Sequence, residues 1–291
     1  MTGKVGTLAE RGTVSGTRIL ASDIVFGESA RWHDGRFWFS DWGAGEVIAI
    51  DLAGNREVIT RLPTFPFSLD WLPDGRLLIV SAGLQRMEAD GSLVSHGDLT
   101  HLAAAWNELV VDSRGNAYVN QAGFDLMGGA APTSGTIAMV LPDGSARQVA
   151  DDVWFPNGMA VTADDSTLIV AESYRNRLSA FDIDDDGGLS NRRVWADLGN
   201  DVPDGICIDA EGAVWYADVP NRHCARVAEG GQVLQTVTLD RGCFSCALGG
   251  PHGRTLFIVA TQWNGPEHMF QGERTGQVVT IDVAVAHAGH P

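Results

Sequence analysis

A short motif recurs six times along the chain and constrains its fold more than any other feature. Each copy is an apolar strand, a tight turn and a second apolar strand, as in Leu69–Val80 and Ile206–Tyr216. This spacing is typical of β-propeller blades, which place four strands in roughly 40–50 residues. The turn residues Gly35, Gly75, Gly115, Ser166, Gly212 and Gly253 are separated by 40, 40, 51, 46 and 41 residues.

Several copies continue into a third strand, and some into a fourth. Third strands are expected at 46–50, 135–140, 177–181 and 277–281, and a fourth strand at 146–149. The last copy leaves no room for a fourth strand after Ile281, so we expect the opening segment, around Val5 to Leu20, to supply it. The sequence thus predicts an all-β fold, a six-bladed β-propeller with four-stranded blades, as a single domain over residues 1–291. We expect the tail from Asp282 to Pro291 to be frayed.

One polar residue opens the first strand of each copy. It lies 7 to 9 positions before the turn residue every time, so the six positions are in register. The first strand of a blade lines the central channel of a propeller, and equivalent side chains therefore meet at one mouth of that channel. We interpret the two serines as channel lining or water contacts. The six residues are Glu28, Ser68, Asn107, Asn157, Asp204 and Ser245.

Four members of this ring carry oxygen donors suited to a hard cation. Glu28 and Asp204 offer carboxylates, and Asn107 and Asn157 offer amides, without a thiolate or an imidazole. This set favours Ca²⁺, Mg²⁺ or Mn²⁺, and Zn²⁺ or Fe²⁺ bound by oxygens is an alternative. Taken singly, the Asn157-Gly158 and Asp204-Gly205 pairs are also good turn sequences. Four oxygen ligands in register favour the metal site over four unrelated turns.

Apolar residues stand directly before the polar ring and predict a hydrophobic collar around it. Small-molecule pockets generally combine apolar walls with a few polar groups at the base. Core packing between loops is the alternative for some of these residues. We expect Phe26, Trp106, Trp154 and Phe155 to contact a substrate, with Phe67 and Phe244 nearby, and Phe124 and Trp263 are weaker candidates.

Composition limits the classes of partner. The chain has 20 Lys and Arg residues against 37 Asp and Glu residues, a formal net charge of −17, which disfavours nucleic acid and anionic membranes as partners. We expect a small-molecule partner, a monomer or weak homo-oligomer, and a cytoplasmic address, since no signal peptide or spanning segment is evident. Cys207, Cys224, Cys243 and Cys246 are expected as buried thiols, with half a zinc site at Cys243-x-x-Cys246 as the alternative.

Four motifs occur in order over nearly the whole chain: Phe26-Gly27-Glu28, Asn107–Asp112, Pro156–Val161 with Val170–Ser173, and Pro203–Ile206. They resemble the senescence marker protein, regucalcin and gluconolactonase family, within the calcium-dependent phosphotriesterase superfamily. The resemblance implies one divalent cation, Ca²⁺ foremost, held by Glu28, Asn157 and Asp204. It implies Asn107 beside the substrate or completing the metal shell, and Asp204 as the acid/base of lactone hydrolysis.

One position departs from the pattern of this family. Sugar lactonases of the family commonly carry an arginine two residues before the Asn107 position, where it contacts substrate hydroxyls, and this chain has Ala105 there. The difference weighs against a polar sugar substrate and favours a less polar lactone or ester.

We therefore expect a metal-dependent hydrolase, a lactonase related to gluconolactonases. The alternatives are phosphotriesterase-like hydrolysis, cyclisation or isomerisation at the same metal site, and a cation-binding propeller without turnover. His223 and Glu172 are secondary candidates for the site, because each lies close to the end of a predicted strand.

Overall fold

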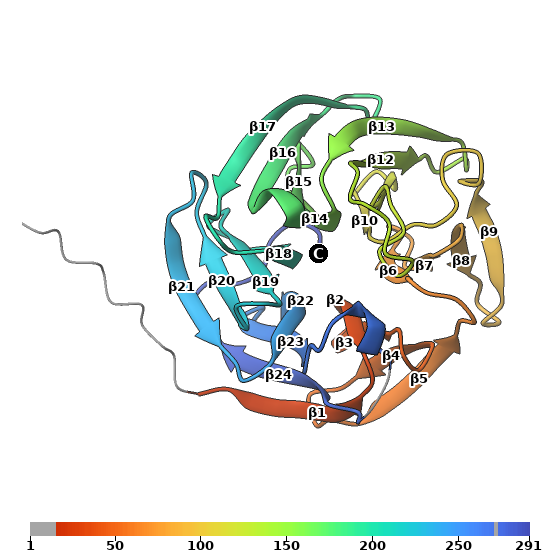
Figure 1. Cartoon of the computed structure of the whole chain (residues 1–291). Helices are drawn as coiled ribbons and strands as arrows, with labels where there is room; N and C mark the ends of the chain where they lie inside the picture. The colour runs from red at the N-terminus through yellow and green to blue at the C-terminus, as the bar shows by residue number, and fades with distance from the viewer. Residues whose placement is uncertain (1–15, 271–272) are drawn as a thin grey trace, which may run out of the picture.

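Six four-stranded antiparallel sheets are arranged in a ring around a central axis (Figure 1). The computed structural model describes residues 16–270 and 273–291, and within them the chain forms 24 strands and two short 3₁₀ helices, η1 (Ser173–Arg175) and η2 (Pro266–His268). The six-bladed β-propeller predicted from the repeat is confirmed.

The blades follow chain order, and each runs from an inner strand at the axis to an outer strand. Blade one comprises β2 (Gly27–His33), β3 (Arg36–Asp41), β4 (Glu46–Ile50) and β5 (Arg56–Arg61). Blade two comprises β6 (Ser68–Trp71), β7 (Leu77–Val80), β8 (Leu84–Met87) and β9 (Leu93–Gly97). Blade three comprises β10 (Leu109–Val111), β11 (Ala117–Gln121), β12 (Gly135–Val140) and β13 (Ala146–Val153). Blade four comprises β14 (Pro156–Val161), β15 (Thr167–Glu172), β16 (Arg177–Ile183) and β17 (Leu189–Asp197). Blade five comprises β18 (Pro203–Ile208), β19 (Val214–Asp218), β20 (His223–Val227) and β21 (Val233–Thr238). Blade six comprises β22 (Gly242–Gly249), β23 (Thr255–Thr261), β24 (Gly276–Asp282) and, outermost, β1 (Arg18–Ile24).

The inner hairpin of each blade turns where the repeat predicts. Five of the six turn residues are glycines with φ between 65° and 85°, a left-handed conformation in which a side chain is unfavourable. In blade four, where Ser166 replaces the glycine, Asp165 takes this conformation with φ of 55°. Asp tolerates positive φ better than most residues, and the hairpin therefore survives the substitution.

Blade six joins the two ends of the chain. Strand β1 pairs antiparallel with β24, with Arg18 opposite Thr280, and it is the outer strand of that sheet. The predicted closure by an N-terminal strand is therefore confirmed. The strand runs from Arg18 to Ile24, later than expected, and residues 5–15 of the expected segment lie outside the described residues.

The C-terminal tail is not frayed, contrary to the expectation from the sequence. After β24 the chain crosses the channel, and the C-terminus lies near the middle of the ring (Figure 1). The Ala288 N–H donates to Ile208 at 3.0 Å, and Val161 and His290 exchange two backbone hydrogen bonds of 2.7 and 2.9 Å. Val161 and Ile208 end the inner strands β14 and β18, so the tail covers the channel mouth opposite to the predicted polar ring.

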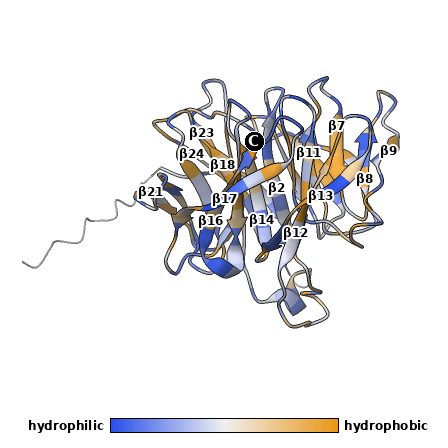
Figure 2. Cartoon of the chain, turned by 90° about the horizontal axis from the view of Figure 1, so that it is seen from above, coloured by the Kyte–Doolittle hydropathy of each residue, from blue (hydrophilic) through white to orange (hydrophobic). Residues whose placement is uncertain are grey.

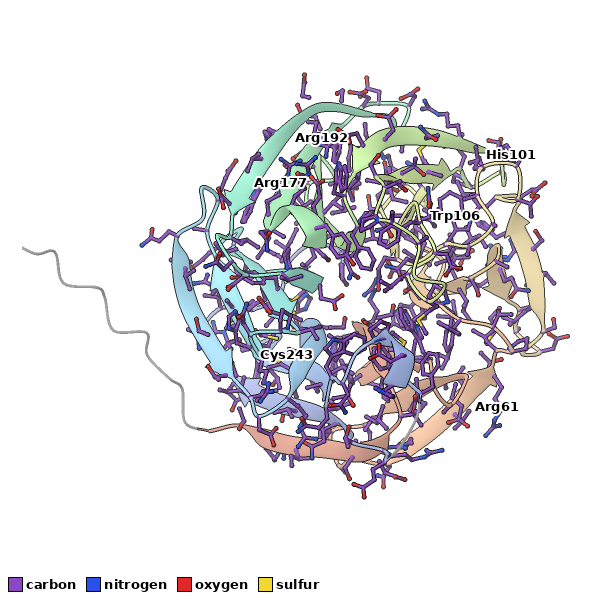
Figure 3. All side chains as sticks on the ribbon, viewed as in Figure 1. Arg61, His101, Trp106, Arg177, Arg192 and Cys243 are labelled. Carbon is purple, nitrogen blue, oxygen red and sulfur yellow. The ribbon has the colours of Figure 1, made fainter. Side chains whose placement is uncertain are left out.

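Buried apolar side chains fill the spaces between blades. In the described chain they form six clusters, each drawn from two neighbouring sheets, and strand β7 shows the apolar colour clearly in Figure 2. The cluster between blades five and six contains all four cysteines as free, buried thiols, including Cys243 (Figure 3). The prediction of buried thiols is confirmed. No helix in the described ranges has the length and hydropathy needed to cross a bilayer.

Candidate metal and substrate site

The inner strands begin at one mouth of the channel, and the predicted polar residues lie there. Glu28, Asn157 and Asp204 are the second residues of β2, β14 and β18, and Asn107 lies two residues before β10. All four side chains line one cavity of about 810 Å³. The structure therefore brings together four residues that are far apart in the sequence.

The glycines that follow two of these residues have a packing role. A Cβ on Gly158 would lie 2.6 Å from the Asp204 carbonyl oxygen, and a Cβ on Gly205 would lie 2.7 Å from the Ser245 Cα. Such distances are too short for non-bonded atoms, so glycine is required where neighbouring inner strands approach each other closely. Asn157-Gly158 and Asp204-Gly205 lie inside strands, and the alternative that they are turns is wrong.

Irregular strand pairing aims these side chains into the cavity. The register shifts between Glu28 and Arg31 in the β2–β3 pair, and similar shifts follow Pro156 in β14 and Pro203 in β18. A β-bulge inserts an extra residue into one strand and changes the direction of its side chains, and bulges are common beside active sites. The polar ring thus lies where three inner strands depart from regular pairing.

The two ring carboxylates are buried and incompletely partnered. Glu28 is 4% exposed and Asp204 is 8% exposed. The Glu28 Oε2 and the Asp204 Oδ1 are buried atoms without a hydrogen-bond donor. Burial raises the pKa of Glu28 well above its usual value, and the charges of Asp204 and Glu108 raise it further. Burial, Glu108 and Asp218 raise the pKa of Asp204 in the same way.

The buried carboxylate of Glu108, in contrast, already has a cationic partner. The Arg31 guanidinium lies 3.4 Å from the Glu108 Oε2 and donates to the Leu109 carbonyl at 2.6 Å. No ion pair of Glu28 or Asp204 occurs within the described residues. Two buried carboxylates without a counter-charge are unfavourable unless a proton or a cation joins them. The donor set, completed by the Asn157 amide, fits a hard divalent cation.

A second group of metal-type ligands occurs in blade five, outside the cavity lining. Atoms of Asp201, Asp218 and His223 lie within 4.8 Å of one another. These atoms are engaged: the Tyr216 hydroxyl donates to the Asp201 Oδ2 at 2.6 Å, His223 Nε2 lies 3.0 Å from the same oxygen, and the Val202 N–H donates to Asp218 at 2.8 Å. The unpartnered oxygens of Glu28 and Asp204 fit a cation better, and His223 lies away from the cavity.

Three of the four collar residues predicted to contact a substrate, Phe26, Trp106 (Figure 3) and Phe155, line the cavity. Trp154 lies elsewhere, contrary to the prediction: its indole N–H donates to Asp152 at 2.9 Å, and the Arg175 guanidinium lies 4.6 Å from its ring centre. Phe155 has φ of 49°, in the left-handed region, so the chain is not extended between these two side chains. This geometry brings Phe155 into the cavity and directs Trp154 away.

Glu172 is accounted for by contacts within blade four. Its carboxylate lies 2.8 Å from Arg177 and 2.9 Å from Arg192, both labelled in Figure 3, and it accepts a hydrogen bond from Ser179. Burial would raise the pKa of Glu172, but these hydrogen bonds and charges lower it overall. The residue does not line the cavity and holds strands β15, β16 and β17 together.

The two ring serines join neighbouring blades. The Ser68 hydroxyl donates to the Asn107 carbonyl at 2.7 Å, and the Ser245 hydroxyl accepts a hydrogen bond of 3.0 Å from the Ala30 N–H. Ser68 therefore fixes the backbone of a predicted substrate-binding residue. Neither contact is visible in the sequence, where the serines have the pattern of simple channel lining.

Most of the cavity residues missed at the sequence level lie in loops, whereas Tyr174 lies in η1 and Gln121 ends β11. The signal of the apolar ones is an aromatic or long apolar residue shortly after a strand. Phe244 and the weaker candidates Phe124 and Trp263 do line the cavity, whereas Phe67 belongs to the core between blades one and two. The missed lining residues include Trp42, Phe65, Gln121, Met127 and Tyr174.

A family model described as SMP-30/Gluconolactonase/LRE-like region matches residues 26–262. Regucalcin of Xenopus laevis is 35% identical over 132 residues, which are 43% of this chain and 44% of that protein. Regucalcin of Homo sapiens is 30% identical over 154 residues, 50% of this chain and 51% of that protein. The chain thus aligns with about half the length of these relatives.

Solved structures share the fold over nearly the full length. The calcium-binding protein regucalcin from Agrobacterium tumefaciens has a TM-score of 0.82 at 23% identity and covers 98% of this chain and 99% of its own. A gluconolactonase from Xanthomonas campestris has a TM-score of 0.74 at 22% identity, over 92% of this chain and 89% of its own. At these identities the similarity establishes the propeller fold.

Proposed function

The chain belongs to the SMP-30/gluconolactonase/LRE-like family, and we propose that it is a metal-dependent hydrolase that opens a lactone ring. The observation that carries the proposal is the pair of buried carboxylates, Glu28 and Asp204, with unpartnered oxygens at the base of the cavity. We propose that Glu28, Asn157 and Asp204 hold one divalent cation, with Ca²⁺ the first choice over Zn²⁺, Mg²⁺, Mn²⁺ and Fe²⁺. When bound, the cation would polarise the lactone carbonyl.

The side chains of the cavity would perform the remaining chemistry. Asp204 would accept a proton as water attacks the carbonyl carbon, and would return it to the ring oxygen when the carbon–oxygen bond breaks. Asn107, whose backbone is fixed by Ser68, would orient the substrate with its amide. Phe26, Trp106 and Phe155 would pack against the substrate and limit the water that reaches it. The product is a hydroxy acid, which balances one water added and one ester bond broken.

The surroundings of the site support a small neutral substrate in a reducing compartment. Ala105 lines the cavity at the position where a sugar lactonase of this family commonly has an arginine, which supports a lactone less polar than a sugar lactone. Four free, buried thiols suit a compartment such as the cytoplasm, where thiols remain reduced.

The test begins with metal analysis of the purified protein. Turnover of a lactone and ester panel is then measured before and after chelation and metal return, in ¹⁸O-labelled water. Asp204→Asn is expected to lower kcat/KM by at least ~100-fold, because it removes the proton acceptor, with an unchanged circular dichroism spectrum. The control is Asp201→Asn, which changes a carboxylate in the group of Asp201, Asp218 and His223 outside the cavity. This variant should retain activity.

Two results would contradict the proposal. Full activity after chelation would exclude the metal-dependent reaction. Product without ¹⁸O would exclude hydrolysis and favour cyclisation or isomerisation at the same site.

A further inference from the structure

The cavity has two aromatic walls on opposite sides of the channel axis. The first wall comes from blades six and one and consists of Phe26, Trp42 and Phe244. The second wall comes from blades three and four, across the ring (Figure 1), and consists of Phe124, Phe155 and Tyr174. The carboxylates Glu28 and Asp204 line the same cavity as both walls. A ligand that reaches these carboxylates therefore passes between two aromatic surfaces.

Each wall is a continuous aromatic surface. In the first wall the Phe26 ring centre lies 4.6 Å from Phe244 and 5.8 Å from Trp42. In the second wall Phe155 and Tyr174 are stacked, with centres 4.7 Å apart and planes inclined by 13°. Aromatic rings attract other rings at such distances through offset stacking and edge-to-face contacts. The two walls thus offer ring-binding surfaces in addition to apolar area.

The rim of the cavity exposes apolar side chains to solvent. Phe65, Met127 and Tyr174 are 40%, 46% and 42% exposed, and all three line the cavity. Exposed apolar groups gathered in one concave place are typical of ligand sites. Scattered exposed apolar residues elsewhere, such as Leu234 at 42% on β21, lie on the outer surface.

The charges of the cavity disfavour an anionic ligand. Among the described lining residues there is no Lys, Arg or His, and the charged ones are Glu28, Asp125 and Asp204. A carboxylate or phosphate on the ligand would meet no cationic side chain here, and Asp125 would repel it. The cavity of about 810 Å³ falls in the upper part of the range for drug-sized ligands.

We infer that the site takes a neutral lactone or ester that carries an aromatic ring system. The ring lies between the two walls, and the carbonyl reaches Glu28 and Asp204. The reaction at the carbonyl rests on the function proposed above, whereas the binding of the ring rests on the walls alone.

Turnover tests the inference with the metal-loaded protein and three lactones. Dihydrocoumarin is a neutral aryl lactone, δ-decalactone is a neutral aliphatic one, and glucono-1,5-lactone is a polyhydroxylated one. We expect kcat/KM for dihydrocoumarin to exceed that for gluconolactone by at least ~100-fold, because the walls offer few partners for hydroxyl groups. A kcat/KM that is equal or higher for gluconolactone or for δ-decalactone overturns the inference and leaves the lactonase proposal intact.

Binding tests the inference without any reaction. The probe is 3,4-dihydro-2-quinolinone, the lactam analogue of dihydrocoumarin, followed by calorimetry and by quenching of tryptophan fluorescence. Binding of this probe without turnover of any lactone supports the inferred ligand and contradicts the lactonase proposal. Absence of probe binding overturns the inference.

Single substitutions test whether the aromatic ring of the probe binds between the two walls. Tyr174→Ala is expected to weaken probe binding about tenfold through loss of a stacking surface, and the control Leu234→Ala removes an equally exposed apolar side chain on β21 and should not change it. Equal binding by Tyr174→Ala and Leu234→Ala would overturn the inference.

Discussion

The substitution Glu28→Gln tests the claim that no cationic side chain neutralises the Glu28 carboxylate at the base of the cavity. Burial and two neighbouring carboxylates raise the pKa of Glu28 well above the usual value of 4.5. In metal-free protein this carboxyl stabilises the fold fully below its unfolded pKa, and the contribution is lost as pH rises through the raised folded pKa. The wild-type melting temperature should therefore fall with increasing pH, and glutamine should remove the part of the slope that is due to Glu28.

The expected shifts follow from the size of the chain. About 2.1 cal/mol/K of unfolding entropy per residue over 291 residues gives about 0.6 kcal/mol/K. Each unit by which the folded pKa exceeds the unfolded one costs about 1.4 kcal/mol of stability at high pH, or about 2 °C. In contrast, Ca²⁺ at about 100 times its dissociation constant would stabilise the wild type by about 2.7 kcal/mol, or about 4 °C.

The assay is thermal unfolding of both proteins from pH 5 to 9, in chelator and in Ca²⁺. We expect the variant to melt higher than the wild type at pH 8 in chelator, and to gain little from Ca²⁺. The wild type should lose its downward slope when Ca²⁺ is present, because the cation keeps the carboxylate ionised. A variant that melts lower in chelator, or that gains as much from Ca²⁺ as the wild type, would refute the reasoning.

Two further predictions concern the framework of the site. Gly205→Ala places a Cβ 2.7 Å from the Ser245 Cα and should destabilise the fold by about 1–3 kcal/mol. The control is Gly83→Ala, whose Cβ would have no atom within 4 Å and which should melt at the wild-type temperature. Equal melting temperatures of the two variants would argue against the close approach of the inner strands. Removal of residues 283–291 should lower the melting temperature and accelerate hydrogen exchange at the Val161 N–H, whose acceptor is the His290 carbonyl; unchanged exchange there would contradict the observed tail.

Local sequence signals predicted the blades well. The expected third strands at 46–50 and 135–140 match β4 and β12 residue for residue, because a hairpin depends on nearby turn residues and alternating side chains. Glu28, Asn157 and Asp204 were placed on inner strands from their distance of 7 to 9 positions to the turn residue. The register of a repeat carries this information even though the residues are far apart in the chain.

The remaining features depend on contacts that no local pattern encodes. The tail pairs His290 with Val161, which lies two blades away, and nothing in its composition announces that partner. The sequence placed Trp154 and Phe155 together in the collar, yet the chain directs them apart at a residue with positive φ. Trp42 lies in a loop and Tyr174 in η1, where neither repeat register nor strand alternation predicts the direction of a side chain.

The most direct measurement of the central claim is the position of a bound cation in crystals grown with Ca²⁺ or Mn²⁺, located by anomalous scattering. We expect a peak at the cavity base, with oxygens of Glu28, Asn157 and Asp204 at the roughly 2.3–2.6 Å typical of Ca²⁺. A peak at Asp201, Asp218 and His223 instead, or no peak at either group, would contradict it.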